Sequence, residues 1–227
     1  MGHAPENTIL SVQKALELGA DCIEIDAYLI DGHLIVFHDD RLERTTNGHG
    51  SIDQNFDYLR TLDAGKGQKI PTLEEIMETV QMRAGVNIEL KAHDFAKPVV
   101  DFVNKIRNQG WADNLLLLSS FDRHELALVH ELDKNIKIGV LINSSPEDAI
   151  SFAQEIDAYS VHISIGIMNR DIIEKAHTND LKVFVYTVNR REDVIRMNNL
   201  GVDGVFTDFP EKVIKTLGNK KISIGWN

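Results

Sequence analysis

The stretch Cys22-Ile23-Glu24-Ile25-Asp26 places two carboxylates one residue apart inside an apolar run. This alternation predicts a β-strand, and alternate residues of a strand point the same way, so Glu24 and Asp26 share a face. The two carboxylates are therefore expected to lie side by side on the same face of the sheet. An alternative is that they are solvent-facing charges on a half-buried antiparallel strand.

A second apolar run, Val86-Asn87-Ile88-Glu89-Leu90-Lys91, repeats the pattern. Glu89 and Lys91 share one face of this predicted strand, and Ile88 and Leu90 take the other. Together with Glu24 and Asp26, they give three carboxylates and a lysine. This combination predicts a divalent cation beside an anionic substrate.

Short runs rich in Val, Ile and Leu alternate with longer amphipathic stretches along the chain, which is typical of βα units. The predicted strands are Asp21–Ile30, Val86–Lys91, Leu115–Ser119, Ile136–Ile142, Ala158–Ser164, Val183–Val188 and Gly204–Thr207. The predicted helices are Asn7–Leu18, Leu73–Met82, Ala96–Asn108, Arg123–Leu132, Pro146–Gln154, Asp171–Thr178 and Arg191–Asn199. This pattern predicts one α/β domain over residues 1–227, a TIM-type (β/α)8 barrel whose first strand is missing from the chain.

The segment after the first predicted strand departs from a plain βα repeat. Asp31-Gly32 separates two apolar runs and predicts a two-residue hairpin. His38 follows that hairpin, and residues 39–70 are expected to form a loop insertion at the carboxyl end of a strand, where barrel enzymes carry their chemistry. We therefore predict that His38 is a catalytic acid or base, with a purely structural histidine as the alternative.

Composition restricts the class of protein. The net charge of −11 argues against a protein that binds nucleic-acid backbones, because such proteins need a basic surface. The single cysteine, Cys22, cannot form an internal disulfide, and the N-terminal residues lack the pattern of a signal peptide, which predicts a cytoplasmic protein. No apolar run is long enough to predict a membrane span.

Several short motifs, in this order along nearly the whole chain, resemble the glycerophosphodiester phosphodiesterase family. They are Ala4-Pro5-Glu6-Asn7-Thr8, Glu24-Ile25-Asp26, Val36-Phe37-His38-Asp39, Arg44-Thr45-Thr46-Asn47-Gly48, Ile88-Glu89-Leu90-Lys91, Tyr186-Thr187-Val188-Asn189 and Asp203-Gly204-Val205-Phe206-Thr207-Asp208-Phe209-Pro210. The resemblance implies a TIM-barrel hydrolase that cleaves glycerophosphodiesters into glycerol 3-phosphate and an alcohol, with Ca²⁺ or Mg²⁺ in its site.

The resemblance also implies roles for single residues. Glu24, Asp26 and Glu89 match the family's metal carboxylates, His38 matches one of two catalytic histidines, and Lys91 matches a cation on the phosphate side. Tyr186 stands where the family usually has tryptophan, so it keeps an aromatic wall for the glycerol but changes its size.

Three further residues are supporting candidates. Glu6 belongs to the Pro-Glu-Asn-Thr segment, and Ser119 to a strand end that resembles a pocket-lining segment of the family, although serine there is equally a cap or turn residue. Arg44 could hold a phosphate in bidentate fashion, with a solvated loop charge as the alternative.

One motif of the family is absent from the chain. Family members carry a first strand ending in His-Arg-Gly shortly before Pro-Glu-Asn-Thr, whereas only five residues precede Glu6 here. His3 falls between the two motif positions and is not expected to replace the lost histidine. The second hypothesis is therefore a catalytically impaired barrel that binds phosphodiesters or a protein. A barrel aldolase or isomerase is less well supported, since the sequence announces no Schiff-base lysine.

Overall fold

The computed structural model describes residues 2–218 and 225–226. Its strands form one sheet in the order β2-β1-β3-β4-β5-β6-β7-β8. β1 and β2 are antiparallel, and every other neighbouring pair is parallel. The strands are β1 (Cys22–Ile30), β2 (His33–Val36), β3 (Gly85–Leu90), β4 (Leu116–Ser120), β5 (Lys137–Ile142), β6 (Ser160–Ser164), β7 (Lys182–Tyr186) and β8 (Gly204–Val205).

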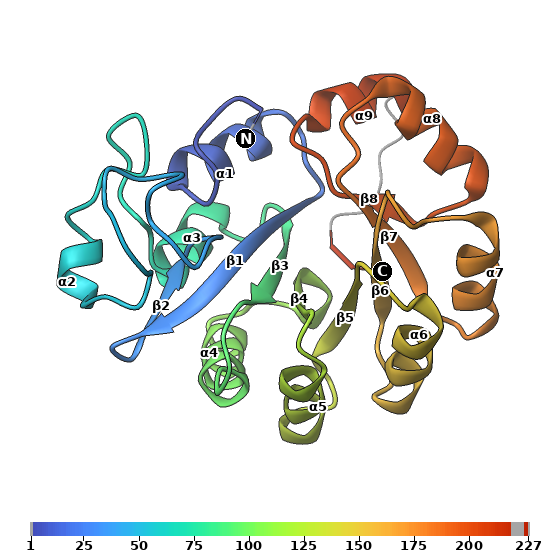
Figure 1. Ribbon diagram of the computed structural model, residues 1–227, viewed down its shortest axis with the longest axis horizontal. Coiled ribbons are helices and arrows are strands. Elements are labelled where there is room, and N and C mark those ends of the chain that lie inside the picture. Colours follow the sequence, from blue (N-terminus) through green and yellow to red (C-terminus); the bar gives the residue numbers. More distant parts are fainter. Residues whose placement is uncertain (1, 219–224, 227) are drawn as a thin grey trace.

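Helices alternate with the parallel strands and, apart from the short α2 in the segment after β2, cover the outer face of the sheet (Figure 1). They are α1 (Ile9–Glu17), α2 (Phe56–Leu59), α3 (Leu73–Val80), α4 (Ala96–Asn108), α5 (Arg123–Leu132), α6 (Pro146–Glu155), α7 (Arg170–Thr178), α8 (Arg191–Leu200) and α9 (Pro210–Leu217), with a short 3₁₀ turn, η1 (Asp113–Leu115), before β4. Side-chain caps set several starts. Thr8 and Thr72 form capping boxes at α1 and α3, and Asp122 caps α5.

The sheet curls into a half-barrel that is open between β1 and β8 (Figure 1). Within residues 2–218 and 225–226, no strand pairs β1 with β8. The main hydrophobic core lies between the sheet and its outer helices, with Ile23, Ile25 and Ile88 among its members. The residues that alternate with them face the concave side, where the polar side chains gather.

The predicted α/β architecture with parallel strands is confirmed, and the Asp31-Gly32 hairpin forms as β1 and β2. The hairpin places β2 on the edge of β1 that does not pair with β3, and Ala27 is paired with Val36. The amide of Phe37 then donates to the carbonyl of Asp26 at 2.9 Å. This hydrogen bond places His38 next to β1, the strand that carries Glu24 and Asp26.

Residues 39–70 are more ordered than the loop expected from the sequence. They contain α2, and an isolated bridge pairs Arg41 with Ser51. A second hydrophobic cluster, which includes Leu42, Ile52 and Leu59, packs beneath them against the hairpin. Apolar residues spaced irregularly through a polar segment escape a search for periodicity, which explains why this small core was not predicted.

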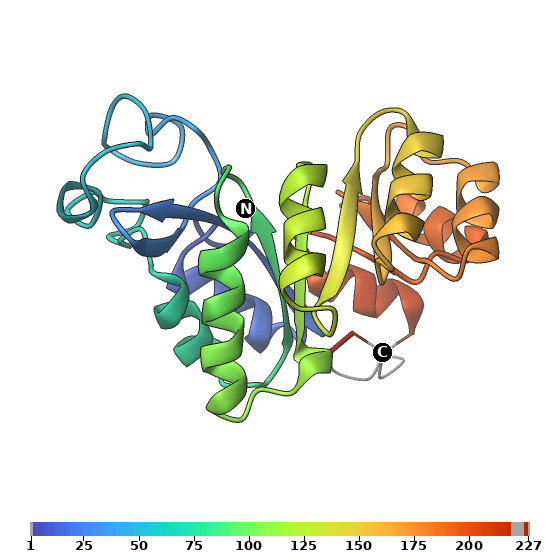
Figure 2. The same ribbon diagram turned by 90° about the horizontal axis from the view of Figure 1, so that it is seen from below.

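Trp226 lies at the amino ends of the strands, near Gly85 at the start of β3 and Lys137 at the start of β5. The 39–70 segment lies at the opposite end of the sheet (Figure 2). Its side chain is 4% exposed and packs edge-on against Phe184, with ring centroids 5.4 Å apart. Its amide donates to the carbonyl of Asn114 at 2.6 Å, and Lys137 donates to its carbonyl. Trp226 thereby covers the amino-terminal end of the half-barrel.

None of the helices in the described part of the chain combines the length and hydropathy that a membrane crossing requires.

Candidate active site

Parallel pairing of β1 with β3 brings the acidic residues of the two strands together. Asp26 is the register partner of Glu89, and Glu24 is the partner of Asn87. Because alternate residues share a face, all four side chains lie on the concave side of the sheet. The two predicted carboxylate motifs therefore form one group, which lies beside the first half of β1 and the carboxyl end of β3.

Glu24, Asp26 and Glu89 form a triad in which one carboxylate oxygen of each residue lies within 4.8 Å of the others. Lys91 completes the group. Its ammonium lies 3.0 Å from Glu89 Oε1 and 3.4 Å from Asp26 Oδ1. The sequence-predicted metal residues and the predicted phosphate-side cation thus meet at one place.

The charges of the triad act strongly on one another. Burial first, and then the charge of Asp26, raise the pKa of Glu89, while Lys91 and His38 partly offset the rise. Desolvation by the surrounding protein, followed by Asp26 and Glu89, raises the pKa of Glu24 well above its ordinary value. The Glu24 side chain also reaches solvent, and the negative charges of Asp26 and Glu89 beside it disfavour its ionised form.

Lys91 is held as a cation by the same neighbours. Burial alone would lower its pKa, but the charges of Glu89 and Asp26 outweigh burial and raise the pKa above its usual value. A single ammonium cannot neutralise three carboxylates. The concave face therefore keeps an excess of negative charge that favours a further cation.

Asn7 fixes the orientation of Asp26 from the segment before α1. Its Nδ2 donates to Asp26 Oδ2 at 2.8 Å, and its Oδ1 accepts the Asp26 amide at 3.2 Å. Asn7 was predicted only as a helix start, whereas the helix begins at Ile9 with Thr8 as its cap. Its left-handed φ of 53° turns the side chain toward β1 instead.

His38 is exposed and belongs to a chain of polar contacts. Its Nδ1 lies 2.5 Å from Asp39 Oδ1, and because an ionised carboxylate only accepts, the proton of this contact is on Nδ1. Nε2 is thereby left for a substrate. Arg44 in turn donates to both oxygens of Asp39 and to Glu6. The hydrogen bond from Arg44, with smaller help from His38, lowers the pKa of Asp39 to about 2.

Arg44 and Glu6 are thus bound to each other, and Arg44 is an exposed loop charge that is paired with Asp39 and Glu6. Sequence reasoning missed Asp39 as a site residue although it directly follows His38. An Asp beside a candidate catalytic histidine is a signal that could have identified it, because His orientation is commonly set by a carboxylate.

Tyr186 lies at the carboxyl end of β7, and its hydroxyl donates to the carbonyl of Ile142 at 3.0 Å. Burial, with a smaller contribution from the charge of Glu89, raises the pKa of Tyr186 to about 12. Its ring meets Phe121 edge-on at 6.3 Å between centroids. Ser119 is the register partner of Glu89, and within the described structure its buried Oγ has no hydrogen-bond partner.

His3 does not join this group. Its Nε2 lies 3.1 Å from Glu211 Oε1, next to α9, and its ring packs against Phe209 at 5.6 Å.

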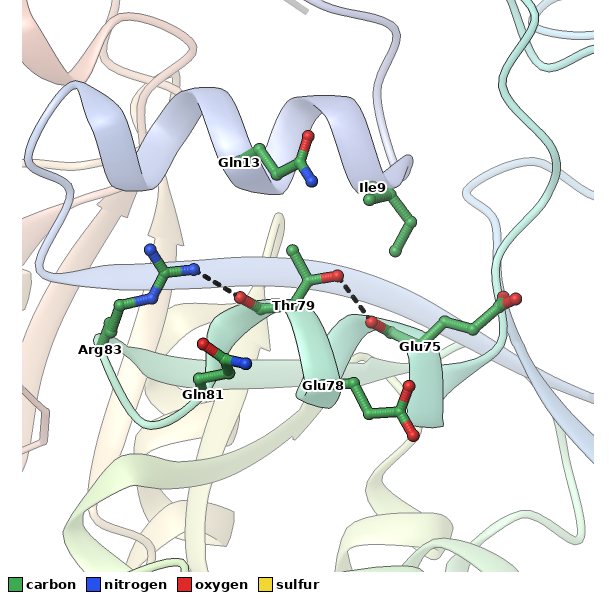
Figure 3. Close-up of a pocket in the computed structure, with 7 residues that line it drawn as sticks. All are labelled: Ile9, Gln13, Glu75, Glu78, Thr79, Gln81 and Arg83. Carbon is green, nitrogen blue, oxygen red and sulfur yellow. Dashed lines mark hydrogen bonds between the residues drawn. The ribbon is translucent and has the colours of Figure 1, made fainter.

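A hollow of about 500 Å³ lies elsewhere, between α1 and α3 on the outside of the sheet. Figure 3 shows Gln13 above Thr79 and Arg83 there, and the Arg83 guanidinium turned to the carbonyl of Thr79. None of the triad residues lines it, and its polar side chains are of ordinary surface type. The chemistry of the concave face, not the size of this hollow, indicates the active site.

Comparison with known proteins decides the family. The model of the glycerophosphoryl diester phosphodiesterase family matches residues 1–212. The chain belongs to this family.

Relatives of similar length support the assignment. The glycerophosphodiester phosphodiesterase of Caldanaerobacter subterraneus subsp. tengcongensis is 36% identical, over 93% of this chain and 92% of the relative. The glycerophosphodiester phosphodiesterase of Bacillus altitudinis is 34% identical, over 94% of this chain and 93% of the relative. A phosphodiesterase of Oleispira antarctica, solved with the product sn-glycerol-3-phosphate, superimposes with a TM-score of 0.87 at 30% identity, over 95% of this chain and 92% of that one.

Membership in the phosphodiesterase family makes the chain an enzyme of the phosphoric diester hydrolase class, and the triad agrees with a metal at its centre. Ca²⁺ binds oxygen ligands at about 2.3–2.6 Å, so oxygens on opposite sides of one ion are about 5 Å apart. The three carboxylate oxygens, all within 4.8 Å of one another, fit that span. Their hard, anionic character suits Ca²⁺ or Mg²⁺.

Proposed function

We propose that the protein hydrolyses glycerophosphodiesters to glycerol 3-phosphate and an alcohol with the help of a divalent cation. The observation that carries this proposal is the Glu24, Asp26 and Glu89 triad beside Lys91, in a chain of the phosphodiesterase family. A bound Ca²⁺ or Mg²⁺ would neutralise charge on the non-bridging oxygens of the phosphate. The comparisons do not favour the alternative of a noncatalytic binding module.

Lys91 would bind a phosphate oxygen of the substrate. Its stem is largely buried, with 17% of the side chain exposed, and its ammonium already faces the triad. A fixed cation at this position stabilises the charge that the phosphate gains in the transition state.

His38 would transfer the proton that phosphodiester cleavage requires. Because Nδ1 is hydrogen-bonded to Asp39, Nε2 is the ring nitrogen that would exchange the proton. Arg44, which is also paired with Glu6, holds Asp39 in place. The substrate's own 2-hydroxyl is the proposed nucleophile: it gives up its proton and attacks phosphorus, the bond to the alcohol oxygen breaks, and the alcohol leaves with a proton. Water then opens the cyclic phosphate to give glycerol 3-phosphate. Tyr186 would form an aromatic wall for the glycerol.

The open side of the half-barrel is the proposed place of a further strand. β8 has only two residues, both half-buried, and β1 and β8 border the opening in Figure 1. A parallel strand ending in His-Arg-Gly at this place would supply a second proton-transfer histidine and a phosphate-binding arginine, as the family resemblance implies.

The test is metal-dependent release of glycerol 3-phosphate from a glycerophosphodiester. We expect a chelator to abolish release and Ca²⁺ or Mg²⁺ to restore it. Glu89→Gln should weaken calorimetric Ca²⁺ binding and lower release by at least about 100-fold, because it removes one charged ligand. Glu131→Gln, an exposed change on α5, is the matched control and should leave both unchanged. Unchanged metal binding in Glu89→Gln would refute the triad as a metal site.

A further inference from the structure

The turn between β3 and α4 begins with Lys91, and residues of β4 and α5 hold it by hydrogen bonds. Ser120, at the end of β4, donates from Oγ to the carbonyl of Leu90 at 2.8 Å. Asp122, which caps α5, has Oδ2 2.7 Å from His93 Nδ1. Lys91 therefore lies between anchoring contacts that come from one neighbouring segment.

The strongest of these contacts comes from Glu125, in the first turn of α5. Its carboxylate accepts three backbone amides of the turn, from Asp94 at 2.8 Å, Phe95 at 3.0 Å and Ala96 at 2.7 Å. The residue is only 1% exposed. Hydrogen bonds to an ionised acceptor are stronger than neutral ones, so a buried carboxylate with three amide donors is a rigid anchor.

The sequence of the turn explains why an external anchor is needed. α4 begins after Phe95, which makes no side-chain capping bond, so its first amides lack a local acceptor. Asp94 has a φ of 58°, a left-handed conformation that costs energy for a residue with a Cβ. Glu125 supplies the missing cap from an adjacent helix and favours this conformation of the turn.

We propose that Glu125 is a positioning residue of the active site: its buried carboxylate fixes the β3–α4 turn and thereby holds the Lys91 ammonium in place beside Glu89 and Asp26. Glu125 acts through the backbone and touches no substrate. This inference rests on the proposed function of Lys91 as the phosphate-side cation.

The decisive variant is Glu125→Gln. Glutamine keeps the shape of the side chain but has a single acceptor oxygen, so its amide group faces at least one backbone N–H donor and the negative charge is lost. We expect faster hydrogen exchange at the amides of Asp94, Phe95 and Ala96. We also expect glycerol 3-phosphate to bind about tenfold more weakly, the size of effect that supporting residues of a binding site commonly produce.

A double-mutant cycle separates positioning from general stability. In a Lys91→Ala background, Glu125→Gln should weaken glycerol 3-phosphate binding no further, because the group that it positions is gone. Asn169→Ala is the matched control. Asn169 caps α7 by accepting the Ile172 amide at 3.0 Å, far from Lys91 in the sheet order, and its loss should not alter binding.

A crystal structure of the Glu125→Gln protein measures the placement of Lys91 independently of activity. We expect the 3.0 Å contact between Lys91 Nζ and Glu89 Oε1 to be lost or divided among conformers. An unchanged Lys91 position would overturn the inference, as would an equal effect of Glu125→Gln with and without Lys91. If Glu125→Gln does not fold, Glu125→Asp, whose shorter side chain draws the carboxylate away from the three amides, is tested in the same way.

The two proposals can fail separately. A parent protein that neither binds glycerol 3-phosphate nor releases it would refute the proposed function. The crystal structure of the variant would still decide whether Glu125 positions Lys91.

Discussion

Arg44 shows how one side chain can link residues that lie far apart in the sequence. It joins Glu6, before α1, to Asp39, which holds the proposed catalytic His38. These contacts lower the pKa of Asp39 to about 2, so the folded protein favours its charged form. This shift makes part of the stability of the protein depend on pH.

We expect Arg44→Met to lower the free energy of unfolding at pH 7 by about 1 kcal/mol, because the pair is partly exposed and screened by solvent. A lowered carboxyl pKa contributes stability above the unfolded value of 3.8, and that contribution is lost as pH falls toward 2. The difference between parent and variant should therefore shrink between pH 4 and pH 2. Urea unfolding at pH 7 and pH 3 measures it.

Lys97→Met is the control for this prediction. Lys97 pairs with Asp101 on the surface of α4, where both side chains are more than half exposed, so its removal should change stability little at either pH. A pH-independent loss in Arg44→Met would contradict the assigned role of Asp39.

At the scale of elements, the packing of β5 against β6 depends on a glycine that has no side chain. Gly139 on β5 leaves room for His162 on β6, since a Cβ at residue 139 would lie 2.4 Å from His162 Nε2. His162 is fully buried, and burial lowers its pKa to about 3, so its ring is neutral. Its ring cannot swing into solvent to relieve the clash.

Gly139→Ala should therefore destabilise the protein by about 1–3 kcal/mol, as overpacking of a tight core does. Gly166→Ala is the control, because its nearest neighbour would be 3.7 Å away. Thermal unfolding compares the two. If the clash is the cause, Gly139→Ala combined with His162→Ala should cost less than the sum of the single changes; additive losses would point to another cause.

At the scale of the whole molecule, the open side of the half-barrel connects stability with catalysis. An unpaired strand edge leaves backbone groups without partners and the concave face without one wall. We expect that fusing a strand ending in His-Arg-Gly ahead of Gly2 raises the melting temperature and the turnover together. A fusion ending in Ala-Ala-Gly should restore only the stability.

The chain without the fusion should release glycerol 3-phosphate more slowly than the fused one, because an added proton-transfer group contributes about 10²–10⁴ in rate. Full activity without the added strand would show that other residues supply the second histidine's role. Glycerol 3-phosphate release and thermal unfolding are measured on the same preparations.

The amino-acid sequence alone determined the βα order, the hairpin and the acidic face of two strands. α4 and α5 begin and end at the predicted residues, since each has a regular apolar periodicity. Local periodicity also predicted that Glu24 shares a face with Asp26, and Glu89 with Lys91. The parallel register of β1 and β3 then brought the two pairs together.

Only the tertiary structure decided which residues hold this site in place. Asn7 on Asp26, Arg44 on Asp39 and Glu125 on the turn after Lys91 are each contacts between segments far apart in the chain or in different elements. Their residue types are common at helix caps and on surfaces, so local sequence favours those ordinary roles. A hydrogen bond between distant segments depends on how the whole chain packs. The periodicity within one segment cannot predict it, because that periodicity does not specify which other segment lies alongside.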